Sequence, residues 1–205
     1  MTERVPGVIL AGGRATRMGG GDKSLRALGG RRILDRVVER LARQCAPLAL
    51  NANGDPARFA DLGLPVLADS IPGHPGPLAG VLAGLDWAAA QGAAEVVTVA
   101  ADTPFFPEDL VARLCAARSA TGLALAATPD ETGRLRRHPT FGLWPVALRD
   151  DLRAALAGGL RKVVLWTDGH GAGTARFAID PFDPFFNINR PEDVAEAERL
   201  LGRVA

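Results

Sequence analysis

The sequence predicts a single three-layer α/β/α domain with a mostly parallel central sheet. Short apolar runs typical of buried strands alternate along the chain with segments of helical period, and this alternation is typical of a parallel sheet covered by helices. A length of 205 residues is enough for one full hydrophobic core, and no repeat or linker divides the chain. Gly and Pro make up about a fifth of the residues, which suits a fold with many tight connections.

The clearest strands are continuous apolar runs, as expected where both faces of a strand are buried. The run VILA at 8–11 ends abruptly at Gly12, and the run EVVTVA at 95–100 is the most strand-like segment of the chain. Further strands are expected at 48–50, 65–68, 123–127, 140–144, 176–179 and 185–188.

Helices are expected where apolar residues recur with a period near 3.6. Ile33 to Leu41 shows this period, and Pro191 stands in the first turn of a helix at 191–201. Other helices are expected at 78–91, 107–118 and 146–156. The apolar run at 161–166 fits either a strand or a short buried helix, and the polar segment 128–138 predicts a mobile loop.

Composition limits the classes of function. The 24 Lys and Arg residues nearly cancel the 23 Asp and Glu residues, which argues against general nucleic-acid binding. No apolar run reaches the roughly 18 residues of a membrane span, and residues 1–6 are polar, unlike a signal peptide. Cys45 and Cys115 lack metal-type spacing and are expected to be buried thiols. We therefore expect a soluble, cytoplasmic protein that binds neither nucleic acid nor membrane.

Ligands of parallel sheets bind beyond the carboxyl ends of the strands, and a glycine-rich segment follows the first predicted strand. Residues 12–21 contain five glycines, and Arg14, Arg17 and Lys23 lie in or beside this stretch. Backbone N–H groups of such a loop can surround phosphate oxygens, and Arg17 and Lys23 can add charge-assisted contacts. The segment has neither Walker nor Rossmann spacing, but it predicts an anion site.

Polar residues also follow the second and third predicted strands. Asn51 begins the segment NAN at 51–53, where an amide can either hydrogen-bond a nucleoside or form a turn. Asp69 can either cap its loop or accept hydrogen bonds from N1–H and the amino group of guanine. The segment GPLAG at 76–80 either approaches a ligand through its glycines or simply begins a helix.

Asp102 follows the strand at 95–100 in an apolar setting. A carboxylate there is costly unless a cation or hydrogen-bond donors compensate it. Mg²⁺ commonly takes one or two carboxylates together with substrate phosphates, so we favour a metal ligand over a helix cap. Asn187 and Asn189 form another polar turn, and Asn189 fits a helix N-cap as well as a site residue.

Several of these segments together resemble a known family. The segment LAGGRATRMGGGDKSL at 10–25 resembles the signature LAGGxxxRMGxDK of nucleotidyltransferases with a Rossmann-like, GT-A-type fold. Further similar segments are NAN at 51–53, PVLAD at 65–69, GPLAG at 76–80, ADTPF at 101–105, RHPT at 137–140 and NIN at 187–189. Over nearly its whole length the chain resembles the molybdenum cofactor guanylyltransferase family.

The resemblance implies a reaction, a cofactor and partners. Members of this family transfer GMP from GTP to the terminal phosphate of molybdenum-bound molybdopterin, which yields a guanine dinucleotide cofactor and pyrophosphate, and they use Mg²⁺. Residues 1–105 would then form a GTP- and Mg²⁺-binding half and residues 106–205 a pterin-side half. GTP and molybdenum-molybdopterin are the implied substrates. Proteins of molybdopterin biosynthesis and of molybdoenzyme maturation are the implied partners.

The resemblance also assigns roles to individual residues. Those implied to bind GTP are Leu10, Ala11, Gly12, Lys23, Asn51, Asp69 and Asp102, with Asp102 also on Mg²⁺. Those implied to act in catalysis are Arg17, Lys23 and Asp102. Those implied on the pterin side are Arg137, His138, Asn187 and Asn189. The chain departs from the family pattern at Gly19–Gly21, where a larger residue is common, and at Ala101, where a cysteine is common.

Other functions stay open at the level of sequence. A transferase that uses CTP on molybdopterin, or one that activates a sugar phosphate, would need the same glycine-rich loop, although Asn51, Asp69 and the GPLAG segment favour guanine. A non-catalytic nucleotide-binding cofactor carrier is a further alternative, against which Arg17, Lys23 and Asp102 argue. The terminal phosphate of molybdopterin is already ionised at neutral pH, so the transfer needs positioning and charge neutralisation rather than a strong base.

Overall fold

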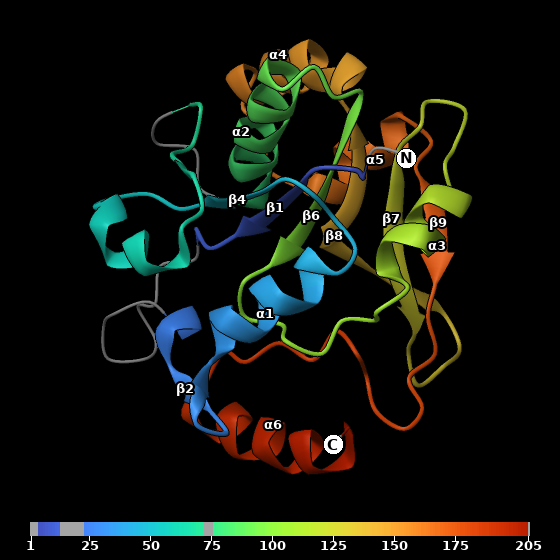
Figure 1. Ribbon diagram of the computed structural model, residues 1–205. Coiled ribbons are helices and arrows are strands. Elements are labelled where there is room, and N and C mark those ends of the chain that lie inside the picture. Colours follow the sequence, from blue (N-terminus) through green and yellow to red (C-terminus); the bar gives the residue numbers. More distant parts are fainter. Residues whose placement is uncertain (1–3, 13–22, 72–75, 205) are drawn as a thin grey trace.

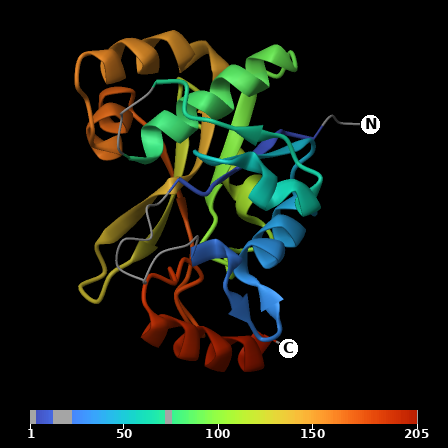
Figure 2. The ribbon, with the colours of Figure 1, turned by 90° about the vertical axis from the view of Figure 1, so that its left-hand side faces the viewer.

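The centre of the molecule is a seven-stranded sheet with strand order β5-β4-β1-β6-β8-β7-β9. The computed structural model describes residues 4–12, 23–71 and 76–204 (Figure 1). Helices cover both faces of the sheet (Figures 1 and 2), which confirms the predicted three-layer α/β/α class. The strands are β1 (Gly7–Leu10), β4 (Leu48–Asn51), β5 (Val66–Leu67), β6 (Glu95–Ala100), β7 (Ala124–Pro129), β8 (Leu135–Pro145) and β9 (Gly173–Arg176).

Most strand pairs are parallel, as predicted. β5, β4, β1 and β6 pair in parallel along one half of the sheet, and β9 is parallel to β7. β8 runs antiparallel between β6 and β7. Leu10 at the end of β1 lies opposite Asn51 on one side and Ala100 on the other. The carboxyl ends of these three strands therefore lie at one level.

The alternation of side chains along β1 explains its unbroken apolar sequence. Val8 and Leu10 pack in one core cluster and Ile9 packs in another, because successive side chains of a strand point to opposite faces. The first cluster lies under α2 (Pro77–Ala90), α4 (Arg149–Ala157) and α5 (Val163–Gly169). The second lies under α1 (Ile33–Ala42) and α3 (Leu110–Ala116).

A third, smaller core lies beyond the carboxyl ends of the strands. Helix α6 (Pro191–Val204) packs there beside the hairpin of β2 (Ala27–Leu28) and β3 (Arg31–Arg32), as Figures 1 and 2 both show. Leu28, Phe105, Ile188 and Leu200 are buried together in this cluster. The hairpin and the 3-10 helices Lys23–Leu25 and Pro56–Leu62 were not predicted, whereas the helix expected at 146–156 begins as the 3-10 turn Val146–Leu148 and continues as α4.

The prediction of a loop at 128–138 is wrong, because β7 continues to Pro129 and β8 begins at Leu135. The Asp130 carboxylate accepts hydrogen bonds from the backbone N–H groups of Thr132 (2.8 Å) and Arg134 (3.0 Å). Gly133 adopts a φ of 81°, which a residue with a side chain rarely adopts. These interactions close a tight hairpin, so Arg137 and His138 lie on a strand and not in a loop.

Two further strand predictions need correction. The segment 185–188 forms no strand, because its backbone begins in a turn where the N–H groups of Phe185 and Phe186 donate to Asp183 Oδ1 (2.9 Å) and to the Asp183 carbonyl oxygen (3.1 Å). The strand expected at 176–179 lies earlier, at Gly173–Arg176. A Cβ atom on Gly173 would lie 1.8 Å from the carbonyl oxygen of Ala117, so the close approach of β9 needs a glycine there. For the ambiguous run at 161–166, the helix alternative holds, since α5 begins at Val163.

Three further predictions concern the burial of the two cysteine thiols, the division of the chain into two halves, and membrane-spanning segments. Cys45 is buried, which raises its pKa to about 12, and Cys115 is half-buried on α3. The predicted halves, 1–105 and 106–205, both contribute strands to the one sheet. None of the helices in the described part of the chain is both long enough and apolar enough to cross a membrane.

The contact of Gly173 with Ala117 leads to a test of the fold. Gly173→Ala should lower the free energy of unfolding by about 1–3 kcal/mol, because the new methyl group forces β9 away from α3. Gly202→Ala on α6 is the matched control, since a Cβ atom there meets nothing within 4 Å and should be neutral or slightly stabilising. Urea unfolding of both variants measures the difference. Equal stability of the two would show that Gly173 is not needed for the packing of β9.

Candidate functional site

Because β4, β1 and β6 end at the same level, most of the predicted GTP-binding residues lie at one edge of the sheet. The Ala11 N–H group donates to the Asn51 carbonyl oxygen (2.8 Å), and the Ala101 N–H group donates to the Leu10 carbonyl oxygen (3.1 Å). Leu10, Ala11 and Gly12 therefore lie between the end of β4 and the end of β6. Arg17 lies in the segment 13–22, outside the described residues.

Asp102 lies two residues beyond β6 and is half-buried. Burial raises the pKa of its carboxyl group above the ordinary value, while the charge of Lys23 and hydrogen bonds from Thr103 and Asn187 oppose that rise. The carboxylate thus sits in a poorly hydrated position that favours a nearby cation. Lys23 and Asn187, both predicted from the sequence, are close enough to Asp102 to act on its ionisation.

The C-terminal segment completes this group. The Lys23 Nζ atom donates to Asn189 Oδ1 (2.8 Å), and the Ile188 N–H group donates to the Asp102 carbonyl oxygen (3.0 Å). The sequence also allowed Asn189 to be the N-cap of a helix, but the side chain that accepts hydrogen bonds at the start of α6 is that of Asp193. Asp193 Oδ2 accepts from the N–H groups of Asn189 (2.7 Å) and Arg190 (2.8 Å). The amide side chain of Asn189 is thus available to hold the ammonium group of Lys23.

Lys23, Asp102, Asn187 and Asn189 form what we call the Asp102 cluster. Its carboxylate and amide oxygens are the hard ligands that Mg²⁺ prefers, and its lysine is suited to a phosphate oxygen. Within the described ranges no group of three or more His, Cys, Asp or Glu side chains could hold a metal by itself. A single carboxylate beside a phosphate-binding lysine fits a magnesium ion that substrate phosphates help to coordinate.

A second polar cluster lies at the end of β4. Asn51 is 2% exposed, and its Nδ2 atom donates to the Leu67 carbonyl oxygen (3.1 Å) and to Asp69 Oδ1 (3.0 Å). Asn53 Nδ2 donates to Asp69 Oδ2 (2.7 Å), and the Asp69 N–H group donates back to Asn53 Oδ1 (3.0 Å). A Cβ atom on Gly80 would lie 2.2 Å from Asn51 Oδ1. Gly80, the second glycine of the GPLAG segment, therefore leaves the space that the Asn51 side-chain amide occupies.

These contacts hold the Asp69 carboxylate in place and leave it able to accept more donors. Each of its oxygens accepts one amide N–H, and a carboxylate offers about four lone-pair sites in all. Two adjacent donors, such as N1–H and the amino group of guanine, can use the rest. Asn53 was not among the predicted site residues. The symmetric NAN segment was the signal that could have identified it.

Three of the four predicted pterin-side residues line a cavity of about 760 Å³ beside the Asp102 cluster. Thr103 and Asn187 stand at the Asp102 side of this cavity, and Arg137 and His138 of β8 line it as well. Asn189 is not among the lining residues, since it contacts Lys23 instead. The structure therefore brings Arg137, His138 and Asn187 together and places Asn189 on the Lys23 side.

The charge of this cavity comes from arginine and lysine and not from histidine. His138 stacks on Phe185 with ring centroids 4.2 Å apart, and its Nε2 atom lies 2.8 Å from Thr128 Oγ1. Burial lowers its pKa to about 4, so the imidazole is neutral at pH 7. Arg137 forms an ion pair with Asp168 of α5, and Lys162 lines the cavity too. Lys162 was missed because the sequence left the structure of 161–166 open.

Comparison with known proteins places this geometry in a family. The family model described as "MobA-like NTP transferase domain" matches residues 7–170. The chain belongs to the MobA-like NTP transferases. Asn187 and Asn189 lie beyond the matched residues, yet they contact Asp102 and Lys23 of the MobA-like domain.

Relatives of this MobA-like transferase carry informative names. A "Molybdenum cofactor guanylyltransferase" of Bradyrhizobium sp. (strain ORS 278) is 56% identical over 97% of this chain and 94% of its own length. One of Cereibacter sphaeroides is 52% identical over 98% of this chain and 100% of its own length. A solved structure from Archaeoglobus fulgidus, "Molybdopterin-guanine dinucleotide biosynthesis protein A", aligns with a TM-score of 0.70 at 20% identity. It covers 97% of this chain and 100% of that one, which shows a common fold.

The raised pKa of Asp102 leads to a prediction about stability. Below the ordinary carboxyl pKa of 3.8 the group is protonated in both folded and unfolded chains, and as the pH rises past that value its ionisation increasingly favours unfolding. Asp102→Asn should therefore stabilise the ligand-free protein at pH 7.5, by about 1 kcal/mol, the scale of a poorly compensated buried polar group. The gain should vanish near pH 3.5. Urea unfolding at the two pH values measures it.

Asp130→Asn is the matched control. Hydrogen bonds from Thr132 lower the pKa of Asp130, so ionisation of that carboxyl group favours the folded state and its loss should be destabilising at pH 7.5. Changes of the same sign in both variants would contradict the account of Asp102.

Proposed function

We propose that this MobA-like transferase transfers GMP from GTP to the terminal phosphate of molybdenum-bound molybdopterin, with release of pyrophosphate. The observation that carries the proposal is the identity of 50–56% to molybdenum cofactor guanylyltransferases over nearly the whole chain. The two polar clusters and the adjacent cavity support it, because they offer separate places for a base, a triphosphate and a second anionic substrate.

The base is proposed to lie against the Asn51–Asp69–Asn53 cluster. Its carboxylate is held by two amides and accepts further donors, and guanine offers adjacent N1–H and N2–H₂ donors. Cytosine has only its N4 amino group as donor on the pairing edge, and adenine has its N6 amino group next to an acceptor. Asp69 is half-buried, so its remaining acceptor sites are best satisfied by a base with two adjacent donors, and this favours GTP.

The triphosphate is proposed to lie between the glycine-rich loop and the Asp102 cluster. Lys23 is held by Asn189 so that its ammonium group faces Asp102, where it can bind a phosphate oxygen. Arg17 is proposed to stabilise charge at the α-phosphate or pyrophosphate. Magnesium is proposed as the cofactor, with Asp102 as its carboxylate ligand, and when bound it would neutralise charge on the triphosphate.

The pterin substrate is proposed to occupy the cavity of about 760 Å³. Arg137 and Lys162 supply positive charge for its phosphate, and neutral His138 on Phe185 offers a flat apolar surface. A terminal phosphate oxygen attacks the α-phosphorus of GTP, and the bond between the α- and β-phosphates breaks to release pyrophosphate. That nucleophile is already ionised, so no general base is required and orientation provides much of the rate.

The division into a GTP-binding half (1–105) and a pterin-side half (106–205) is part of the same proposal, although Asn187 and Asn189 bring the second half to the GTP side. A cytoplasmic location and contacts with proteins of molybdopterin biosynthesis and molybdoenzyme maturation stay predictions.

Base selectivity tests the function most directly. Pyrophosphate release with molybdenum-molybdopterin should be about 30- to 1,000-fold more efficient, as kcat/KM, with GTP than with CTP or ATP, the scale of losing hydrogen bonds from the base to a charged acceptor. Asp69→Ala should reduce this preference while kcat with saturating GTP changes less. Asp55→Ala, which removes an exposed loop carboxylate that caps Ala57, is the control and should keep the preference. Equal use of CTP by the wild-type enzyme would favour a cytidylyltransferase instead.

The proposed metal ligand is tested by Asp102→Asn. Turnover should fall by at least ~100-fold, because charge on the transferred group is no longer neutralised. GTP affinity measured without metal should change less than ~3-fold, since the amide keeps the size of the side chain. Asp109→Asn, at the exposed start of α3, should leave turnover intact. Near-normal turnover with unchanged Mg²⁺ dependence in the Asp102 variant would remove Asp102 from the mechanism.

A further inference from the structure

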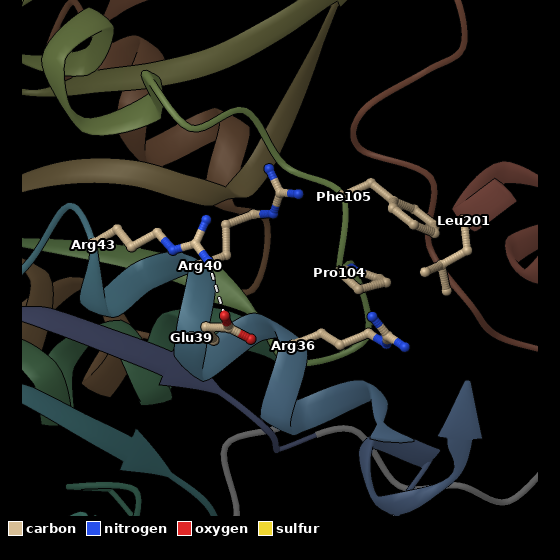
Figure 3. A pocket seen from close by; sticks show the side chains of 7 residues that line it. All are labelled: Arg36, Glu39, Arg40, Arg43, Pro104, Phe105 and Leu201. Carbon is tan, nitrogen blue, oxygen red and sulfur yellow. Dashed lines mark hydrogen bonds and ion pairs between the residues drawn. The ribbon is translucent and has the colours of Figure 1, made fainter. Parts of the chain in front are cut away.

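A second, smaller cavity lies on the other side of the segment that carries Asp102. Its volume is about 190 Å³, and it is bordered by α1, residues 104–105 and α6 (Figure 3). Arg36, Arg40 and Arg43 of α1 line one side, and Pro104, Phe105 and Leu201 line the other. None of the contacts proposed above for GTP or the pterin uses these residues.

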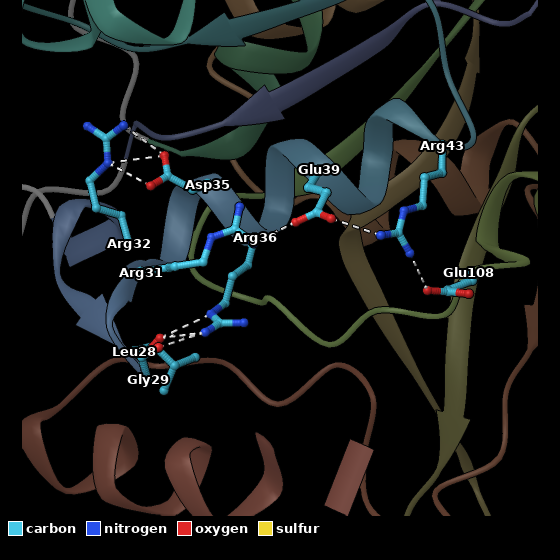
Figure 4. A network of polar contacts seen from close by, with 9 residues as sticks. All are labelled: Leu28, Gly29, Arg31, Arg32, Asp35, Arg36, Glu39, Arg43 and Glu108. Carbon is cyan, nitrogen blue, oxygen red and sulfur yellow. Dashed lines mark hydrogen bonds and ion pairs between the residues drawn. The ribbon is translucent and has the colours of Figure 1, made fainter. Parts of the chain in front are cut away.

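Positive charge exceeds negative charge around this cavity. Glu39 accepts from both Arg31 (2.8 Å) and Arg43 (2.8 Å), and Glu108 pairs with both Arg43 (3.2 Å) and Arg40 (3.7 Å), as the network in Figure 4 shows in part. Three arginines thus share two carboxylates in this chain of ion pairs. Arg36 adds a fourth guanidinium, so the group carries a net charge of +2 where the whole chain carries +1.

Arg36 is held in place without being neutralised. Its Nε and Nη2 atoms donate to the Leu28 carbonyl oxygen (3.1 and 2.8 Å), and Nη2 also donates to the Gly29 carbonyl oxygen (3.2 Å). Carbonyl oxygens accept hydrogen bonds but carry only partial charge. A guanidinium has five N–H donors, so Arg36 is both fixed in direction and able to donate to an anion.

The Arg40 side chain is more buried than that of Arg43, with exposed fractions of 21% and 59%. Its Nη1 atom donates to the Phe106 carbonyl oxygen (3.1 Å). Burial and the charge of Arg43 lower its pKa, although a guanidinium stays protonated in proteins. A charged group that has lost part of its hydration gains more from an anion than an exposed one does. Figure 3 shows Arg36 and Arg40 extending from α1 toward the 104–105 segment.

The size of the cavity selects among anions. A volume of about 190 Å³ is below the roughly 300–1,000 Å³ of pockets that enclose drug-sized ligands. It is well above the roughly 10–15 Å³ that one water needs, which suits one small oxyanion with part of its hydration shell. We propose that this cavity is a binding site for a small phosphate-type oxyanion held by Arg36 and Arg40.

Such an anion would contact the segment that holds Asp102. Thr103 lines the large cavity, whereas the next two residues, Pro104 and Phe105, line the small one. The four residues from Asp102 to Phe105 thus separate the proposed catalytic side from the anion site. Binding on one side is therefore expected to change the environment of backbone groups on the other.

The test is a titration of the full chain with inorganic phosphate, followed by NMR without nucleotide or metal. The Nε–Hε signals of Arg36 and Arg40 and the amide signal of Phe105 should shift and saturate, beyond any shift caused by sodium chloride at equal ionic strength. Arg36→Gln should weaken phosphate binding at these signals by about 10-fold, the scale of a charge-assisted hydrogen bond. Arg199→Gln, which removes an exposed charge from α6, should change it less than ~2-fold.

Arg40→Lys is a second variant in case the first folds poorly, since it keeps the charge and loses the planar donor array. A parallel titration with pyrophosphate identifies the source: tighter binding than phosphate assigns the site to the product of the proposed reaction, and equal or weaker binding assigns it to a single phosphate group. Shifts that match the sodium chloride control, or phosphate affinity unchanged in both variants, would overturn the proposal. Because no turnover is measured, either result leaves the proposed GMP transfer to its own test.

Discussion

Everything at the proposed site depends on the pairing of β1 with a parallel strand on each side. Leu10 lies opposite both Asn51 and Ala100, so three strands end at the same level. A shift of one residue in either pair would turn the side chains of that strand to the opposite face. It would also move Asn51 or Asp102 away from the end of β1. The geometry of the site therefore depends on backbone hydrogen bonds that any apolar strand sequence can make.

The C-terminal segment adds the second constraint. Its backbone is tied to Asp102 by the Ile188 N–H group, and its side chains are anchored by the small core under α6. This brings Asn189 to Lys23 although the two are 166 residues apart in sequence. Ile188 and Phe105 belong to the same apolar cluster, so the hydrophobic effect positions the polar groups on either side of them.

The charged groups around the proposed site match the two anionic substrates that we propose for it. A carboxylate that is poorly hydrated, a lysine held by an amide and a cavity bordered by Arg137 and Lys162 all favour charge of the opposite sign close by. The same reasoning explains the neutral histidine, since a half-buried imidazole stacked on Phe185 contributes shape rather than charge. The arginines of α1 repeat the pattern behind the Asp102 segment, where fixed guanidinium groups outnumber carboxylates.

The sequence by itself determined the layers, the four parallel strands with their helices, and the main polar positions at strand ends. It could do so because a strand buried on both faces must be apolar throughout, and because a polar residue directly after such a strand must lie at the edge of the sheet. Only the tertiary structure decided which of these residues meet. Strand β8 begins inside the segment that was predicted to be a loop, because Asp130 and Gly133 close a hairpin there. Hydrophobic periodicity does not encode such a hairpin. Asn53, Lys162 and the pairing of Asn189 with Lys23 likewise depend on long-range contacts, which chain-local patterns of burial and charge do not specify.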